Sequence, residues 1–134
     1  MTVFFRLQCA LLLIAQSVSA GEGLYQEYCA SCHGAELQGQ PNWRVPNDDG
    51  TLPAPPHDAS GHTWHHDDQM LFEYTKLGGQ AYLDKIGVSG FTSAMPGFAE
   101  DLNDEQIHSI LSFIKSSWPE HIQAAQAERT KLRN

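Results

Sequence analysis

The stretch that decides the fold is "EGLYQEYCASCHGAELQG", Glu22 to Gly39. It holds Cys29, Cys32 and His33 within five positions. Apolar and aromatic residues precede them at roughly helical spacing: Leu24, Tyr25 and Tyr28. This spacing predicts a short helix from Glu22 to Cys32. Two thiols and an imidazole so close together point to a bound metal, a prosthetic group or a redox dithiol.

Each of these three chemistries makes a different demand on the rest of the chain. A structural zinc site normally adds a second Cys/His pair, and no second cysteine pair exists here, although histidines later in the chain could contribute. A redox dithiol follows a strand of a βαβ unit, and the sequence has no alternating strand pattern.

Cys-x-x-Cys-His is also the attachment pattern of c-type haem. Residues three apart on a helix face the same way, so both thiols can add to the haem vinyl groups. The adjacent imidazole can then ligate the iron. The sequence therefore predicts one covalently attached haem c, held by Cys29 and Cys32 and ligated by His33.

A low-spin haem iron needs a sixth ligand, and two methionines follow the first twenty residues. Met70 lies within a predicted helix, where packing is the ordinary role of a methionine. Met95 lies in the irregular stretch "TSAMPGF", and Pro96 stiffens the turn that follows it. We expect His33 and Met95 to be the axial ligands of the iron.

The first twenty residues have the layout of a Sec-type signal peptide. Arg6 supplies a positive charge, Leu7–Ala15 ("LQCALLLIA") is an apolar run, and Val18–Ala20 ("VSA") is a small-residue cleavage pattern. The apolar run is short for a membrane span. We expect residues 1–20 to be cleaved and the mature chain to start near Gly21, with an uncleaved membrane anchor as the alternative.

After residue 20 the chain carries sixteen acidic and seven basic side chains, a net charge of about −9 with neutral histidines. Such a surface repels nucleic acid and anionic lipid. We therefore expect no nucleic-acid partner and at most peripheral membrane contact. The charge either steers the chain toward a basic docking face or only keeps an exported protein soluble.

The middle of the chain combines a long loop with one predicted helix. From Gly34 to Gly61 the prolines and glycines forbid a long helix or a central strand, and loops of this length are usually functional. Thr63–Leu77 ("TWHHDDQMLFEYTKL") is predicted as a helix with Thr63 as its N-cap, ended by Gly78 and Gly79. Gln80–Asp101 is expected to be irregular.

The clearest helix signal is Leu102–Trp118, "LNDEQIHSILSFIKSSW". Asn103 is placed as the N-cap, and Gln106 completes a capping box. Leu102 is placed to form a hydrophobic staple with the start of an apolar stripe, which consists of Ile107, Ile110, Leu111 and Ile114. Pro119 fits the first turn of a further helix, "PEHIQAAQAERT", which is polar and expected to lie on the outside.

Taken together, "GLYQEYCASCHG", the proline-rich loop, a middle helix with Trp64, "AMPGF" and the apolar C-terminal helix resemble a small class I c-type cytochrome, monohaem and His/Met-ligated. The resemblance implies an all-α, cytochrome c-like fold, with about four to five helices wrapped around one covalently attached haem. It divides the chain into a signal peptide (1–20), a cytochrome c domain (21–118) and an additional C-terminal helix and tail (119–134), whose role it does not explain.

The resemblance also implies contacts around the haem. The first and last helices of the domain would cross, with Gly23 and Tyr25 meeting the region 110–113. The Pro55 carbonyl would accept the proximal imidazole N–H, a bond that fixes the ring. Trp64 would pack on the haem edge and bond a propionate. The acidic surface departs from the best-known members, so a lysine-ringed docking face is not implied.

The function that the resemblance implies is that of a periplasmic electron carrier, which docks transiently with redox partner proteins. With both axial positions filled, we expect no enzymatic activity at the iron. Two alternatives remain. A cluster of histidines could handle copper or zinc: His57, His62, His65 and His66. The ordinary interpretation is that they are exposed loop residues or that one of them bonds a haem propionate, and a further one is that one of them replaces Met95 as iron ligand. Alternatively, a labile Met95 would make the chain a haem-based sensor.

Overall fold

The computed structural model describes residues 18–133. Within this range the chain is helical and irregular, and its only β pairing is an isolated bridge between Thr51 and Thr92. The all-α prediction is confirmed. Most of the predicted signal peptide, residues 1–17, lies outside the described residues. No helix between residues 18 and 133 is both long enough and apolar enough to cross a membrane.

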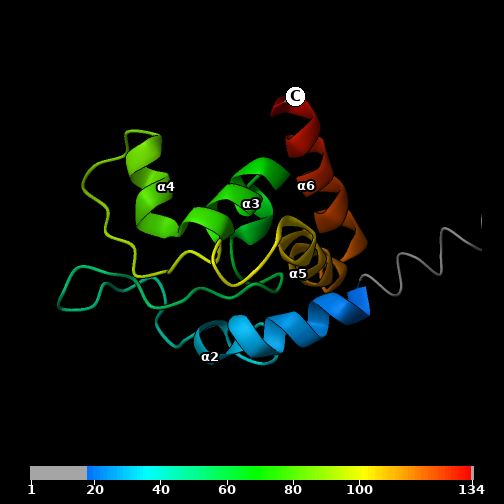
Figure 1. The fold of residues 1–134 in the computed structure, drawn as a ribbon, viewed down its shortest axis with the longest axis horizontal. Coiled ribbons are helices and arrows are strands. Elements are labelled where there is room, and N and C mark those ends of the chain that lie inside the picture. The colour runs from blue at the N-terminus through cyan, green and yellow to red at the C-terminus, as the bar shows by residue number, and fades with distance from the viewer. Residues whose placement is uncertain (1–17, 134) are drawn as a thin grey trace, which may run out of the picture.

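In Figure 1 the N-terminal helix and α2 lie along the bottom, α5 and α6 lie to the right, and α4 lies to the left of α3. The long irregular segment after α2 loops out to the left and returns across the middle of the view. In chain order the elements are an N-terminal helix (18–28), α2 (Ala30–His33), the short 3₁₀ helix η1 (Thr63–His65), α3 (Asp68–Leu77), α4 (Gly79–Lys85), α5 (Asp104–Ser116) and α6 (Glu120–Arg133). The segment from 34 to 62 is irregular, as predicted.

The predicted middle helix starts later than expected. The Asp67 carboxylate accepts a hydrogen bond from the Met70 backbone N–H at 2.9 Å, so Asp67 and not Thr63 is the N-cap of α3. Thr63 belongs to η1 instead. Gly78 ends α3 with a φ of 89°, as predicted.

The helix α4 differs from the sequence prediction, because two consecutive glycines normally end a helix. The structure starts a new helix at the second of them. The backbone N–H of Gly79 finds its acceptor outside the helix, in the carbonyl of Met95 at 3.0 Å, and Tyr82 donates to the carbonyl of Gly78 at 3.0 Å. The prediction that Gln80–Asp101 is irregular is therefore wrong for residues 80–85, because a tertiary hydrogen bond supports the first residue of α4.

The capping box of α5 is present. The Asn103 side chain accepts from the Gln106 backbone N–H, and the Gln106 side chain accepts from the Asn103 N–H, both at 2.9 Å. The predicted apolar stripe is buried, as is the staple residue before it: Leu102, Ile107, Ile110, Leu111 and Ile114. Burying side chains of this size contributes about 1.5–3 kcal/mol each, so α5 is the centre of the core.

The N-terminal helix crosses α5 at a glycine (Figure 1). A Cβ at Gly21 would overlap the Ser109 carbonyl, and the Tyr25 ring lies 5.4 Å from the Phe113 ring. The expected crossing glycine was Gly23, which faces open space. This prediction is wrong because residues four apart share a helix face and residues two apart do not, so the glycine on the face of Tyr25 is Gly21.

The polar C-terminal helix α6 packs by hydrogen bonds. Gln126 is only 1% exposed, and its amide nitrogen lies 3.1 Å from the His66 carbonyl and 2.7 Å from Asp68 Oδ1. The Asp68 backbone N–H donates to Thr130 Oγ1 at 3.1 Å, and Lys115 pairs with the Asp68 carboxylate at 2.7 Å. The expectation of an external helix therefore holds for only one side of α6.

We predict that Gly21→Ala destabilises the protein by about 1–3 kcal/mol, because the added methyl group must push two helix backbones apart. The measurement is denaturant unfolding of the haem-loaded protein. Gly23→Ala is the matched control, because its methyl group enters open space and raises helix propensity by up to about 1 kcal/mol. Equal stabilities for the two variants would contradict the assigned crossing point.

The packing of α6 also predicts that the stability of the protein depends on pH. Burial raises the pKa of Asp68, but hydrogen bonds from Lys115 and Gln126 outweigh it and hold the pKa below the usual 3.8. A depressed carboxyl pKa gives stability that is present above the unfolded value and is lost as the pH falls through the folded value. Asp68→Asn should therefore unfold more easily at pH 7, and its stability should approach that of the parent protein as the pH falls through the folded pKa of Asp68.

The control for this prediction is Glu128→Gln, which removes an exposed pair with Lys131 on the same helix and should change little at any pH. The measurement is denaturant unfolding at a series of pH values. A stability difference between Asp68→Asn and the parent that does not depend on pH would contradict the role given to the Asp68 charge.

Candidate functional site

The two cysteines lie where the N-terminal helix passes into α2. Cys29 occupies the turn between the helices and is the N-cap of α2, and Cys32 follows within α2. Cys29 is buried and Cys32 is exposed, and both are free thiols. Burial, and then the neighbouring Cys32, raises the pKa of Cys29 to about 11. The pair thus lies at the border between the core and the surface.

The last residue of α2 has a fixed tautomer. His33 Nδ1 lies 2.8 Å from the carbonyl oxygen of Pro55, the contact that the resemblance implies. A carbonyl only accepts hydrogen bonds, so Nδ1 carries the proton and Nε2 keeps a lone pair. Burial lowers the pKa of His33, although the bond to Pro55 opposes this shift. His33 is therefore a buried neutral imidazole with one nitrogen ready to ligate a metal.

Close backbone contacts hold Pro55 in place beside His33. The next residue, Pro56, lies against Gly61, where a Cβ would overlap the Pro56 carbonyl. The backbone N–H of His57 donates to the Leu37 carbonyl at 2.8 Å. These contacts fix the loop directly before and after the carbonyl that orients the His33 ring.

His57 is part of the surroundings of His33, which sequence reasoning did not predict. The two imidazole rings stack at 3.8 Å with an interplanar angle of 17°, and the Tyr25 ring meets His57 edge-on at 5.8 Å. Burial, followed by the proximity of His33 and His62, lowers the pKa of His57 well below its usual value. Trp118 Nε1 donates to the His57 carbonyl at 2.8 Å and anchors this residue from the end of α5.

Three buried nitrogens near this site have no hydrogen-bond partner among residues 18–133: Trp64 Nε1, His57 Nδ1 and His62 Nδ1. A buried polar atom without a partner costs about 1–3 kcal/mol, and native proteins rarely tolerate one. An indole N–H can only donate. These atoms fit a bound group that brings acceptor oxygens, and the propionates of a haem would do so.

Met95 lies in a segment that is anchored to the junction of α3 and α4. Its carbonyl accepts the Gly79 N–H at 3.0 Å, and its own N–H donates to Ser93 Oγ at 3.3 Å. The Tyr74 hydroxyl is hydrogen-bonded to the same Ser93 oxygen at 3.0 Å. The Met95 side chain is half-buried. The methionine segment is therefore held by hydrogen bonds although it has no regular structure.

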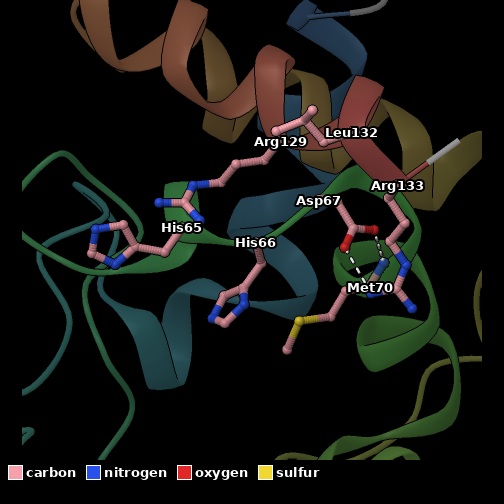
Figure 2. A pocket seen from close by; sticks show the side chains of 7 residues that line it. All are labelled: His65, His66, Asp67, Met70, Arg129, Leu132 and Arg133. Atoms are coloured by element: carbon pink, nitrogen blue, oxygen red, sulfur yellow. Dashed lines mark hydrogen bonds and ion pairs between the residues drawn. The ribbon is translucent and has the colours of Figure 1, made fainter.

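The histidines of the cluster have different neighbours. His62 stacks on Trp43 at 5.4 Å and meets the His66 ring edge-on at 5.4 Å, whereas His65 lies against Trp64 at 3.8 Å. His65 and His66 line a surface hollow that they share with Met70 and with residues of α6 (Figure 2). Residues 18–133 contain no group of three or more His, Cys, Asp or Glu that could hold a metal ion. This finding gives the copper alternative no support.

Comparison with known proteins identifies the family. Residues 16–114 match the family model described as "Cytochrome C oxidase, cbb3-type, subunit III", a c-type cytochrome family. No curated protein and no solved structure gives a significant match. The matched range contains Cys29, Cys32, His33 and Met95 and ends within α5. The predicted c-type cytochrome is confirmed, and such a domain implies a covalently bound haem c. The chain belongs to the cbb3-type family of cytochrome c domains.

Proposed function

We propose that this chain is an exported electron carrier, which passes single electrons between partner proteins through one haem ligated by His33 and Met95. Cytochrome c domains transfer electrons to redox partner proteins. The observation that carries the proposal is the hydrogen bond from His33 Nδ1 to the Pro55 carbonyl, directly beside the cysteine pair. It leaves His33 Nε2 unprotonated, the state that an axial ligand needs.

The residues of α2 and its N-cap would hold the cofactor. Cys29, the N-cap of α2, and Cys32 would bind it as thioethers, and His33 would ligate the iron. Haem c supplies a one-electron ferric/ferrous couple when it is bound. Pro55 keeps the His33 ring in one orientation and raises its basicity as a ligand.

Met95 is the proposed sixth ligand. A ligand on a mobile loop would exchange with water or gases, whereas the Met95 backbone bonds at both its N–H and its carbonyl. Thioether ligation raises the reduction potential. With both axial positions filled, no substrate reaches the iron, and outer-sphere electron transfer is the remaining activity. We therefore favour a carrier over an enzyme or a haem-based sensor.

The surface charge supports a partner of opposite sign. After residue 20 the chain carries a net charge of about −9, which favours fast and salt-dependent association with a basic docking face. Electron-transfer complexes of this kind bury small areas and dissociate readily. The signal-peptide pattern of residues 1–20 supports export, and the periplasm is the proposed location.

We predict that Met95→Ala abolishes the charge-transfer band that a methionine–ferric iron bond produces at the red end of the visible spectrum. The variant should also have a lower reduction potential, because the thioether no longer stabilises ferrous iron. Met70→Ala is the matched control and should keep both properties, because Met70 lines a surface hollow beside α6.

Carbon monoxide provides a second measurement on the same proteins. The reduced parent should not bind it, and reduced Met95→Ala should bind it at the open position. A methionine band that persists in Met95→Ala would disprove the ligand assignment. Carbon monoxide binding by the parent would favour the sensor alternative.

We predict that Trp64→Phe lowers the reduction potential of the haem-loaded protein and destabilises it by about 1 kcal/mol. The change removes the unpaired indole N–H but keeps an aromatic ring. Without this donor, the negative charge of a haem propionate is less compensated, which favours ferric iron. Trp43→Phe is the control, because its ring stacks on His62. Equal potentials for Trp64→Phe and the parent would rule out the propionate contact.

A further inference from the structure

The residues after the family match form contacts that concentrate on one segment of the chain. The match ends at residue 114, so Trp118 and α6 lie beyond it. Their long-range hydrogen bonds reach residues 57–68, which lie about sixty positions earlier in the sequence. This is the segment that carries Trp64, whose indole N–H is unpaired.

Gln126 is the centre of these contacts. It is 1% exposed, and its amide nitrogen reaches both the His66 carbonyl and Asp68 Oδ1. Thr130, one turn later, accepts the backbone N–H of Asp68. A buried amide that leaves its acceptors costs about 1–3 kcal/mol, so these bonds fix the distance between α6 and residues 66–68.

A second contact of α6 strengthens this attachment. Arg133 pairs with the Asp67 carboxylate at 2.9 Å, and Figure 2 shows this pair at one end of the hollow, with Arg129 extending toward His65 at the other. Asp67 is also the N-cap of α3. The end of α6 is therefore attached to the residue that starts α3.

The other end of the segment is attached by Trp118. Its indole N–H donates to the His57 carbonyl, and the His57 ring stacks on His33. Residues 57 and 66–68 are thus both held from the C-terminal part of the chain. Trp64 lies between these two attachments, in the short helix η1.

We propose that Trp118, Gln126 and Thr130 form a C-terminal clamp, which positions Trp64 to donate to a haem propionate and so sets the reduction potential. The inference rests on the proposed function, in which this chain carries a His33/Met95-ligated haem. The hydrogen bonds of the clamp reach residues 57, 66 and 68, and none of them involves the proposed haem-binding residues Cys29, Cys32, His33 and Met95. It fixes the backbone on each side of η1, and an N–H···carboxylate bond weakens steeply when its geometry changes.

The test compares two glutamine-to-leucine variants of α6 as haem-loaded proteins. Gln126→Leu removes the buried amide. Gln123→Leu removes an exposed amide that bonds the backbone carbonyl of Trp118, just before α6, and leaves the bond from the Trp118 indole to His57 in place. Electrochemical titration should give a lower potential for Gln126→Leu, in the direction of Trp64→Phe. Gln123→Leu should keep the parent potential. An unshifted potential in Gln126→Leu would overturn the clamp.

A double-mutant cycle distinguishes two effects of Gln126: positioning of the Trp64 N–H, and a general contribution to the packing of the protein. If Gln126 acts through the Trp64 N–H, then Gln126→Leu should shift the potential much less in the Trp64→Phe background than in the parent. A shift of equal size in both backgrounds would mean that Gln126 acts elsewhere, and it would contradict the proposal.

If Gln126→Leu does not yield folded protein, Thr130→Val is the less disruptive variant to test. It loses one hydroxyl and keeps the side-chain shape. We expect it to lower the reduction potential as Gln126→Leu does, and to show the same dependence on the Trp64→Phe background.

Measurement of the parent protein distinguishes failure of the clamp from failure of the proposed function. A parent without a reversible haem couple contradicts the proposed function, whereas a normal couple that neither α6 variant shifts contradicts only the clamp.

Discussion

The structure depends on the hydrogen bond between His33 Nδ1 and the Pro55 carbonyl, because this bond fixes both the orientation and the tautomer of the imidazole. It joins residues that are 22 positions apart across an irregular segment. No helix or sheet keeps that segment in register, so its backbone must be fixed by other contacts. The loop therefore needs as much structural support as the helices around it.

This support comes from three parts of the chain. Leu37 accepts the His57 N–H from the near side of the loop, and Gly61 lets the backbone pass close to Pro56. The C-terminal residues then hold the loop where it enters α3. Each bond contributes only about 1 kcal/mol net, but together they select one conformation out of many. A haem site built on a loop can therefore be rigid, because many weak contacts stabilise the same loop conformation.

Sequence reasoning succeeded where neighbouring residues decide the outcome. The capping box of Asn103 and Gln106 and the helix end at Gly78 depend on atoms within one turn, and both are present. The family could also be predicted, because "CASCH" occurs together with the proline-rich loop, "AMPGF" and the apolar C-terminal helix, and this combination is specific. The prediction failed where distant contacts decide. The start of α4 needs the Met95 carbonyl, and Gly21 is distinguished from Gly23 only by the partner helix.

The feature of α6 that is hardest to predict is that a polar helix packs against the rest of the chain. This packing has a physical reason. An apolar side chain in place of Gln126 would leave the His66 carbonyl without this donor and Asp68 with Lys115 as its remaining side-chain partner, whereas the Gln126 amide reaches both acceptors. The Trp64 indole N–H is left unpaired within the described residues, and a haem carboxylate is the acceptor that we propose for it. A buried glutamine in a polar helix is therefore consistent with a support for the cofactor, where the sequence pattern alone predicted only an external helix.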